Sequence, residues 1–107
     1  MAESLRQKQS RFARMTAQLI NHATILGYEI TFAEAYRSPE DAASRGFSQS
    51  LHCNRLAIDL NLFKDGVYLT RTDQHEPLGI YWESIGGSWG GRFNDGNHYS
   101  LEHEGIK

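Results

Sequence analysis

Two stretches of this 107-residue chain place imidazoles and carboxylates at spacings that suit a metal ion. SLHCNRLAID carries His52 and, seven residues later, Asp59, while DGNH carries Asp95 and His98 three residues apart. Segment 55–63 alternates like a β-strand, and Asp59 lies on its less apolar face. An odd spacing puts two side chains on opposite faces of one strand. His52 can therefore meet Asp59 only from a loop that precedes the strand.

Two histidines and one aspartate would leave the fourth position of a metal open, as catalytic zinc requires. A further carboxylate beside such a site can act as a general base. Spacing alone leaves other interpretations open, because a histidine in a small domain is more often structural or solvated. A Cys/His peptidase is disfavoured, since Cys53 directly follows His52 and chain neighbours often diverge in space.

Periodicity and turn residues predict the elements that would position these side chains. Apolar residues at helical spacing predict a helix over 4–26, with Ser4 and Gln7 as a capping box. Strands are predicted over 28–37, 55–63 and 98–103, with a further strand at VYLT after the KDG turn. The remaining predictions are a helix start at SPEDAA, a helix from about 73 to 85, and loops over 46–54 and 86–96. Helices and strands mix without a βαβ rhythm, which indicates one α+β domain over 1–107.

Composition narrows the function classes. A net charge of −2 and a pI of about 6.2 argue against a general nucleic-acid binder. One cysteine cannot form an internal disulfide. The first residues lack a continuous apolar segment, so we expect no signal peptide, no stable membrane insertion and synthesis in a cytoplasm. His22 and His75 are predicted to be solvated, and Trp82 and Trp89 to pack in the core or a loop rather than form a substrate platform.

Three motifs together resemble one family. SLHCNRLAID resembles the Ser-x-His-(six residues)-Asp signature of the VanY-like zinc D-alanyl-D-alanine carboxypeptidases and L-alanyl-D-glutamate endopeptidases, which include many phage endolysins. WGGRFNDGNHYSLEH resembles their second motif, and AYRSPEDAA resembles their upstream arginine segment. The three motifs occur in the family's order and span about residues 28–103.

The resemblance implies a small α+β fold shared with the hedgehog signalling domain, with an antiparallel sheet and flanking helices. It implies that His52, Asp59 and His98 bind one zinc ion and that Asp95 is the catalytic acid and base. Arg37 would bind or polarise the substrate, and Ser50 would line the site near the substrate's carboxylate or amide. The signature usually has glycine where this chain has Arg55, and the sequence does not explain that departure.

The leading interpretation is a monomeric, phage-type endolysin that cuts the L-Ala–D-Glu bond of the peptidoglycan stem peptide. It would be made in the cytoplasm and would reach the bacterial wall after release. A D-Ala–D-Ala carboxypeptidase keeps the same chemistry on another bond. A non-catalytic module that binds the wall or serves in a virion is the alternative of another class.

Overall fold

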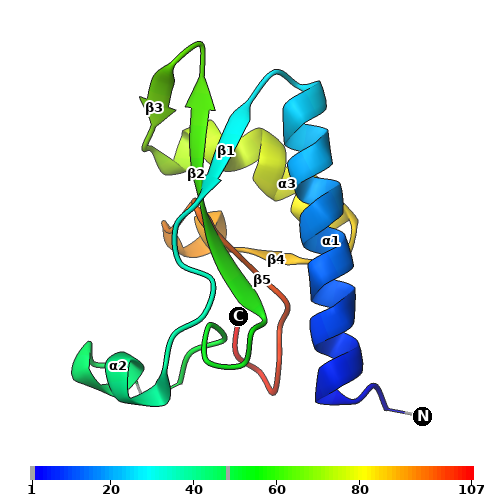
Figure 1. Ribbon diagram of the computed structural model, residues 1–107, viewed down its shortest axis with the longest axis vertical. Helices are drawn as coiled ribbons and strands as arrows, with labels where there is room; N and C mark the ends of the chain where they lie inside the picture. Colours follow the sequence, from blue (N-terminus) through cyan, green and yellow to red (C-terminus); the bar gives the residue numbers. More distant parts are fainter. Residues whose placement is uncertain (1, 48) are drawn as a thin grey trace.

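A computed structural model describes residues 2–47 and 49–107; position 48 of the predicted 46–54 loop lies outside the described residues. The fold is a small α+β domain in which helices flank an antiparallel sheet, as predicted (Figure 1). The helices are α1 (Leu5–Ile25), α2 (Pro39–Ser44) and α3 (Glu76–Ser84), with 3-10 turns η1 (Thr72–His75) and η2 (Gly90–Phe93). The strands are β1 (Glu29–Phe32), β2 (Ala57–Lys64), β3 (Val67–Leu69), β4 (Ser88–Trp89) and β5 (His98–Ser100).

The central strand of the sheet is β2. The strand order is β1-β2-β5-β4, and β3 also pairs with β2. All the pairs are antiparallel; β5 pairs with the first residues of β2, and β3 pairs with its last residues. Asp59, near the start of β2, therefore lies between two segments. On one side it pairs with His98 of β5, and on the other it exchanges backbone hydrogen bonds with Ala33 and Glu34, just after β1.

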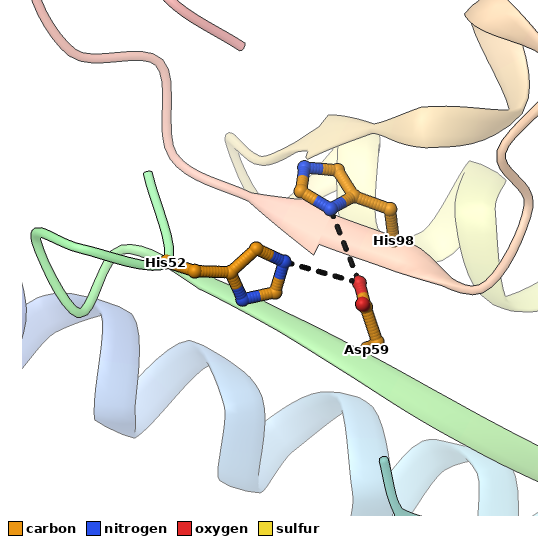
Figure 2. A group of neighbouring side chains, drawn as sticks. All are labelled: His52, Asp59 and His98. Atoms are coloured by element: carbon orange, nitrogen blue, oxygen red, sulfur yellow. Dashed lines mark hydrogen bonds and ion pairs between the residues drawn. The ribbon is translucent and has the colours of Figure 1, made fainter. Parts of the chain in front are cut away.

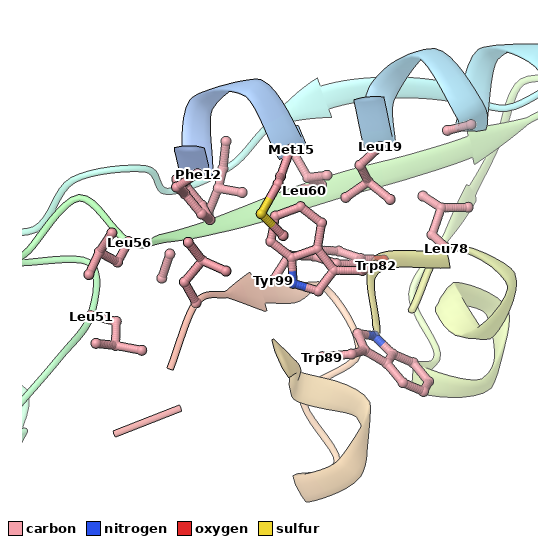
Figure 3. Close-up of a cluster of buried hydrophobic side chains, with 14 of the residues drawn as sticks. Phe12, Met15, Leu19, Leu51, Leu56, Leu60, Leu78, Trp82, Trp89 and Tyr99 are labelled. Atoms are coloured by element: carbon pink, nitrogen blue, oxygen red, sulfur yellow. The ribbon is translucent and has the colours of Figure 1, made fainter. Parts of the chain in front are cut away.

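Helix α1 forms as its capping box predicts. The Ser4 hydroxyl accepts a hydrogen bond from the Gln7 amide, and the Gln7 side chain accepts one from the Ser4 amide. One face of the helix is buried against the sheet and α3, as Figure 3 shows. Burial of each large apolar side chain of this kind contributes about 1.5–3 kcal/mol. The core side chains include Phe12, Met15, Leu19, Leu60, Leu78, Trp82, Trp89 and Tyr99.

Several predicted bounds were wrong. The strand predicted over 28–37 pairs only over Glu29–Phe32, and the strand predicted over 98–103 ends at Ser100. The predicted glycine-rich loop 86–96 contains β4 and η2. For the two strands the amino-acid pattern gave the type of backbone, but hydrogen bonds to distant residues decided where pairing ends. In 86–96, pairing with β5 makes a short strand that the glycine-rich pattern does not indicate.

Of two histidines predicted to be solvated, one is buried and the other is only partly exposed. His75 is buried, and its Nδ1 lies 2.8 Å from the hydroxyl oxygen of Tyr99. His22 is half-buried and stacks on Tyr81 with 3.9 Å between ring centroids. Both tryptophans are buried, in agreement with the packing interpretation.

Over residues 2–47 and 49–107, the structure has no helix with the length and apolar character needed to span a membrane.

Candidate metal centre

Strand pairing brings Asp59 and His98 together. Asp59 on β2 lies directly opposite His98 on β5 in the antiparallel register. Such opposed residues have their Cβ atoms about 4.5–5.5 Å apart, so a carboxylate and an imidazole on the same face meet. The prediction from spacing placed both residues on strands, and the register supplies the contact.

His52 reaches the same point from the turn at 51–55, as the alternation argument required. Its Nε2 lies 3.4 Å from Asp59 Oδ1, and His98 Nδ1 lies 3.2 Å from that same oxygen. Figure 2 shows the two rings directed at the carboxylate from different sides. One donor atom from each residue lies within 4.8 Å of the others, so the three can share one ion.

A backbone contact fixes the orientation of the His52 ring. His52 Nδ1 lies 3.2 Å from the carbonyl oxygen of Ala35, in the segment between β1 and α2. A carbonyl can only accept, so Nδ1 carries a proton and Nε2 faces Asp59. Nε2 donates to the carboxylate when the ring is protonated and would offer its lone pair to an ion when the ring is neutral. Metal-binding histidines usually have such an outer partner.

The charge on Asp59 is stabilised despite burial. Burial raises the pKa of Asp59, but hydrogen bonds from His52 and His98 outweigh that effect and lower it to about 2. Burial lowers the pKa of His52, whereas the hydrogen bond and charge of Asp59 raise it, and the net direction is upward. The carboxylate is therefore ionised throughout the physiological range, as a metal ligand must be.

The residues present fit a zinc ion. Two imidazoles and one carboxylate are a donor set that zinc accepts, and three protein ligands leave one position for water or substrate. The two ring nitrogens that face the shared Asp59 oxygen are His52 Nε2 and His98 Nδ1. His98 Nε2 does not face that oxygen; it is buried, and in the part of the chain that the structure describes it has no hydrogen-bond partner.

Arg37 and Ser50 lie beside the three candidate ligands and contact each other. Arg37 is only 8% exposed, and its Nη1 donates to the Ser50 hydroxyl over 3.2 Å. The same hydroxyl accepts from the backbone amide of His52 over 3.3 Å. Ser50 thus connects the predicted substrate-binding arginine to the loop that carries a candidate ligand.

Sequence reasoning missed Glu34, which holds Arg37 in place. Its Oε1 accepts from Arg37 Nε over 2.6 Å, and its Oε2 accepts from Arg45. The hydrogen bond from Arg37 lowers the pKa of Glu34, and Glu34 in turn raises the pKa of Arg37. The spacing of three residues between Glu34 and Arg37 was the available signal. Its meaning depended on a backbone path that the sequence does not show.

All six predicted site residues line one cleft of about 200 Å³: Arg37, Ser50, His52, Asp59, Asp95 and His98. Asp95 is exposed at this cleft, and its backbone carbonyl accepts from the His98 amide, which ties the turn to β5. Gly90 lies against the same turn. A Cβ atom there would lie 2.2 Å from the Asp95 carbonyl oxygen, so the close approach requires glycine.

The structure explains why the signature usually has glycine at position 55. Arg55 has a φ of 57°, in the left-handed region that glycine adopts without strain. The turn that presents His52 ends here, immediately before β2 begins at Ala57. The Arg55 guanidinium lies 4.2 Å from the centroid of the Tyr36 ring, an interaction that glycine could not make. Arg55 therefore adopts the same turn conformation as glycine would. Its backbone is more strained than that of glycine, but its side chain gains the contact with Tyr36.

Comparison with known proteins adds independent evidence on the family of this chain. A family model described as D-alanyl-D-alanine carboxypeptidase matches residues 43–101, more than half of the chain. The matched range contains His52, Asp59 and His98.

The chain belongs to the D-alanyl-D-alanine carboxypeptidase family. It is accordingly a metallopeptidase of a family that acts on peptidoglycan peptides, with His52, Asp59 and His98 as its buried metal-binding triad.

The fold agrees with that assignment. The crystal structure of the Serratia marcescens L-Ala D-Glu endopeptidase ChiX matches with a TM-score of 0.68 at 18% identity, over 87% of this chain and 79% of that one. At this identity the likeness establishes the fold. No curated protein matches the sequence significantly.

Proposed function

We propose that the protein is a zinc-dependent endopeptidase that hydrolyses the L-Ala–D-Glu bond of the peptidoglycan stem peptide. The observation that carries the proposal is the convergence of a His–Asp–His donor set with Arg37, Ser50 and Asp95 in one cleft. The choice of bond is supported by the fold shared with ChiX, which is an L-Ala D-Glu endopeptidase. The family description favours a second candidate, D-Ala–D-Ala carboxypeptidase activity.

The ion would be held by His52 Nε2, Asp59 and His98 Nδ1, the atoms that already converge. A bound zinc ion supplies Lewis-acid polarisation of a carbonyl and of water. The chain's own groups then divide the remaining work. Asp95, exposed at the cleft, accepts the proton of the attacking water and returns it to the leaving amine.

Arg37 is suited to hold the negative charge that develops on the substrate. Its guanidinium is buried, fixed by Glu34 and Ser50, and permanently charged, so it need not reorganise as the reaction proceeds. Ser50 lies at the same point and offers its hydroxyl to a substrate carboxylate or amide. These roles for Asp95, Arg37 and Ser50 are part of the proposal.

Mass spectrometry of digested muropeptides tests the choice of bond. Release of the stem from its first L-Ala supports the endopeptidase, whereas loss of one terminal alanine identifies the carboxypeptidase. Wall binding without any cleavage by the zinc-loaded protein would instead support a non-catalytic module. Asp95→Asn is the matched inactive control.

We further propose that the protein is a phage-type endolysin that acts as a monomer. It would be made in the cytoplasm and would reach the wall after release. Sedimentation of the zinc-loaded protein tests the monomer. Expression with and without a separately induced membrane lesion tests the route: lysis should require the lesion. Lysis without one would contradict this part of the proposal.

A further inference from the structure

A second cavity, of about 340 Å³, lies next to the metal cleft. It is formed between α2 and the segment 103–106 at the end of the chain, and its volume falls in the range of small-ligand sites. None of the three candidate metal ligands lines it. It is adjacent to the metal cleft because five residues line both, namely Phe47, Gln49, Ser50, Leu51 and Ile106.

A tight turn forms one wall of this cavity. His103 and Ile106 exchange two backbone hydrogen bonds of 2.9 Å, and the residues between them, Glu104 and Gly105, have φ values of 51° and 81°. Positive φ at both central positions defines a type I′ turn, in which asparagine and glycine are preferred. Glutamate there costs about 1–2 kcal/mol. Such strain often accompanies function, and here it places a carboxylate at the rim of the cavity.

The lining of the cavity combines apolar walls with that one carboxylate. The side chains of Ala43, Leu51 and Ile106 supply apolar surface along it. Among the residues that the structure describes, Glu104 pairs only with His103, over 3.8 Å. Lys8, the nearby cation, instead contacts His103 Nδ1 and donates to the backbone carbonyl of Glu102. A ligand with an aliphatic stem and a terminal ammonium group complements this arrangement.

We propose that the cavity binds the side chain of the diamino acid in the stem peptide, with its terminal ammonium group at Glu104. This inference rests on the proposed function. The diamino acid follows D-Glu and precedes the first D-Ala. For the proposed L-Ala–D-Glu cut it is therefore the second residue on the side of the leaving amine, whereas for a D-Ala–D-Ala cut it would be the second residue on the opposite side. A cavity that shares a wall with the metal cleft is placed to receive such a residue. The subsite is therefore proposed for hydrolysis of the L-Ala–D-Glu bond, on the leaving-amine side of the metal cleft.

Kinetics on a matched pair of peptides test the subsite. The pair is a stem pentapeptide with lysine as its diamino acid and the same peptide with that amine acetylated. Exposed ion pairs contribute up to about 1 kcal/mol, so Glu104→Gln should raise KM for the free amine by about 2–5-fold. Glu104→Gln should leave kcat unchanged, and it should leave KM for the acetylated peptide unchanged. Glu104→Lys should raise KM for the free amine further. Glu102→Gln, an exposed neighbour, is the control and should change neither parameter.

Thiol labelling gives a reading that does not depend on turnover. Cys53 is the chain's single cysteine and lines the cavity, so a maleimide reports on its occupancy. The product γ-D-Glu-L-Lys-D-Ala-D-Ala should slow labelling of the wild-type protein, and Glu104→Lys should remove that protection. Ala43→Phe should fill the cavity and raise KM for both peptides.

The outcomes separate the two proposals. If the zinc-loaded protein hydrolyses no stem peptide, the proposed function fails whatever the labelling shows. If hydrolysis proceeds but Glu104→Gln and acetylation leave KM unchanged and the product gives no protection, the subsite alone is refuted.

Discussion

Replacement of Arg55 tests whether its backbone, in the turn before β2, adopts the left-handed conformation. A non-glycine residue in this conformation costs about 1–2 kcal/mol, which Arg55→Gly removes and Arg55→Ala retains. Glycine loses more chain entropy on folding than alanine, by about 0.5–1 kcal/mol. Both variants lose the contact with Tyr36, worth about 0.5–1 kcal/mol at an exposed site. The glycine variant should therefore be more stable than the alanine variant by about 0.5–1 kcal/mol and close to wild type.

Thermal unfolding of the metal-free proteins measures this difference. For a domain of this size it corresponds to a Tm about 2–6 °C higher for Arg55→Gly than for Arg55→Ala. Arg14, exposed within α1, provides the matched control, because there alanine should be more stable than glycine by about 1 kcal/mol. An Arg55→Ala protein as stable as Arg55→Gly would refute the left-handed turn and the explanation of the glycine in the signature.

Three further predictions concern the site and its support. Asp95→Asn should bind zinc as tightly as wild type and lose about 10²–10⁴-fold in kcat; unchanged kcat would remove Asp95 from proton transfer. Burial lowers the pKa of His75, so its contribution to stability is present above its ordinary pKa near 6.5 and is lost as pH falls below that value. Urea unfolding at pH 8 and pH 5.5 should show a larger acid loss for wild type than for His75→Gln; equal losses would contradict this. Gly90→Ala should destabilise the fold by about 1–3 kcal/mol and weaken zinc binding, because its Cβ would lie 2.7 Å from that of His98; zinc titration with wild-type affinity would show that the turn tolerates a side chain.

The sequence predicted the candidate ligands and the type of element that carries each one. Alternation placed Asp59 on a strand and required His52 to come from a preceding loop, and both features are present. The antiparallel sheet came from the family resemblance and is confirmed. These features depend on local pattern or on motifs, which a single sequence retains.

Features that depend on pairing between distant residues were not predictable. The register that opposes Asp59 and His98 is set by β2 and β5 together, and neither segment specifies it alone. Glu34 acquires its role only when the chain after β1 turns Arg37 back toward it. The prediction that His75 is solvated rests on its place near a helix start, whereas Tyr99, 24 positions away, provides its partner.

Zinc titration of the metal-free protein, followed by hydrolysis of stem peptides, tests the central claim most directly. Hydrolysis should be absent after chelation, rise in proportion to added zinc and saturate at one equivalent per chain. His52→Ala, which removes one converging ligand, should fail to recover at that equivalent. Full hydrolysis in the chelated protein, or normal recovery by His52→Ala, would contradict a catalytic zinc ion held by His52, Asp59 and His98.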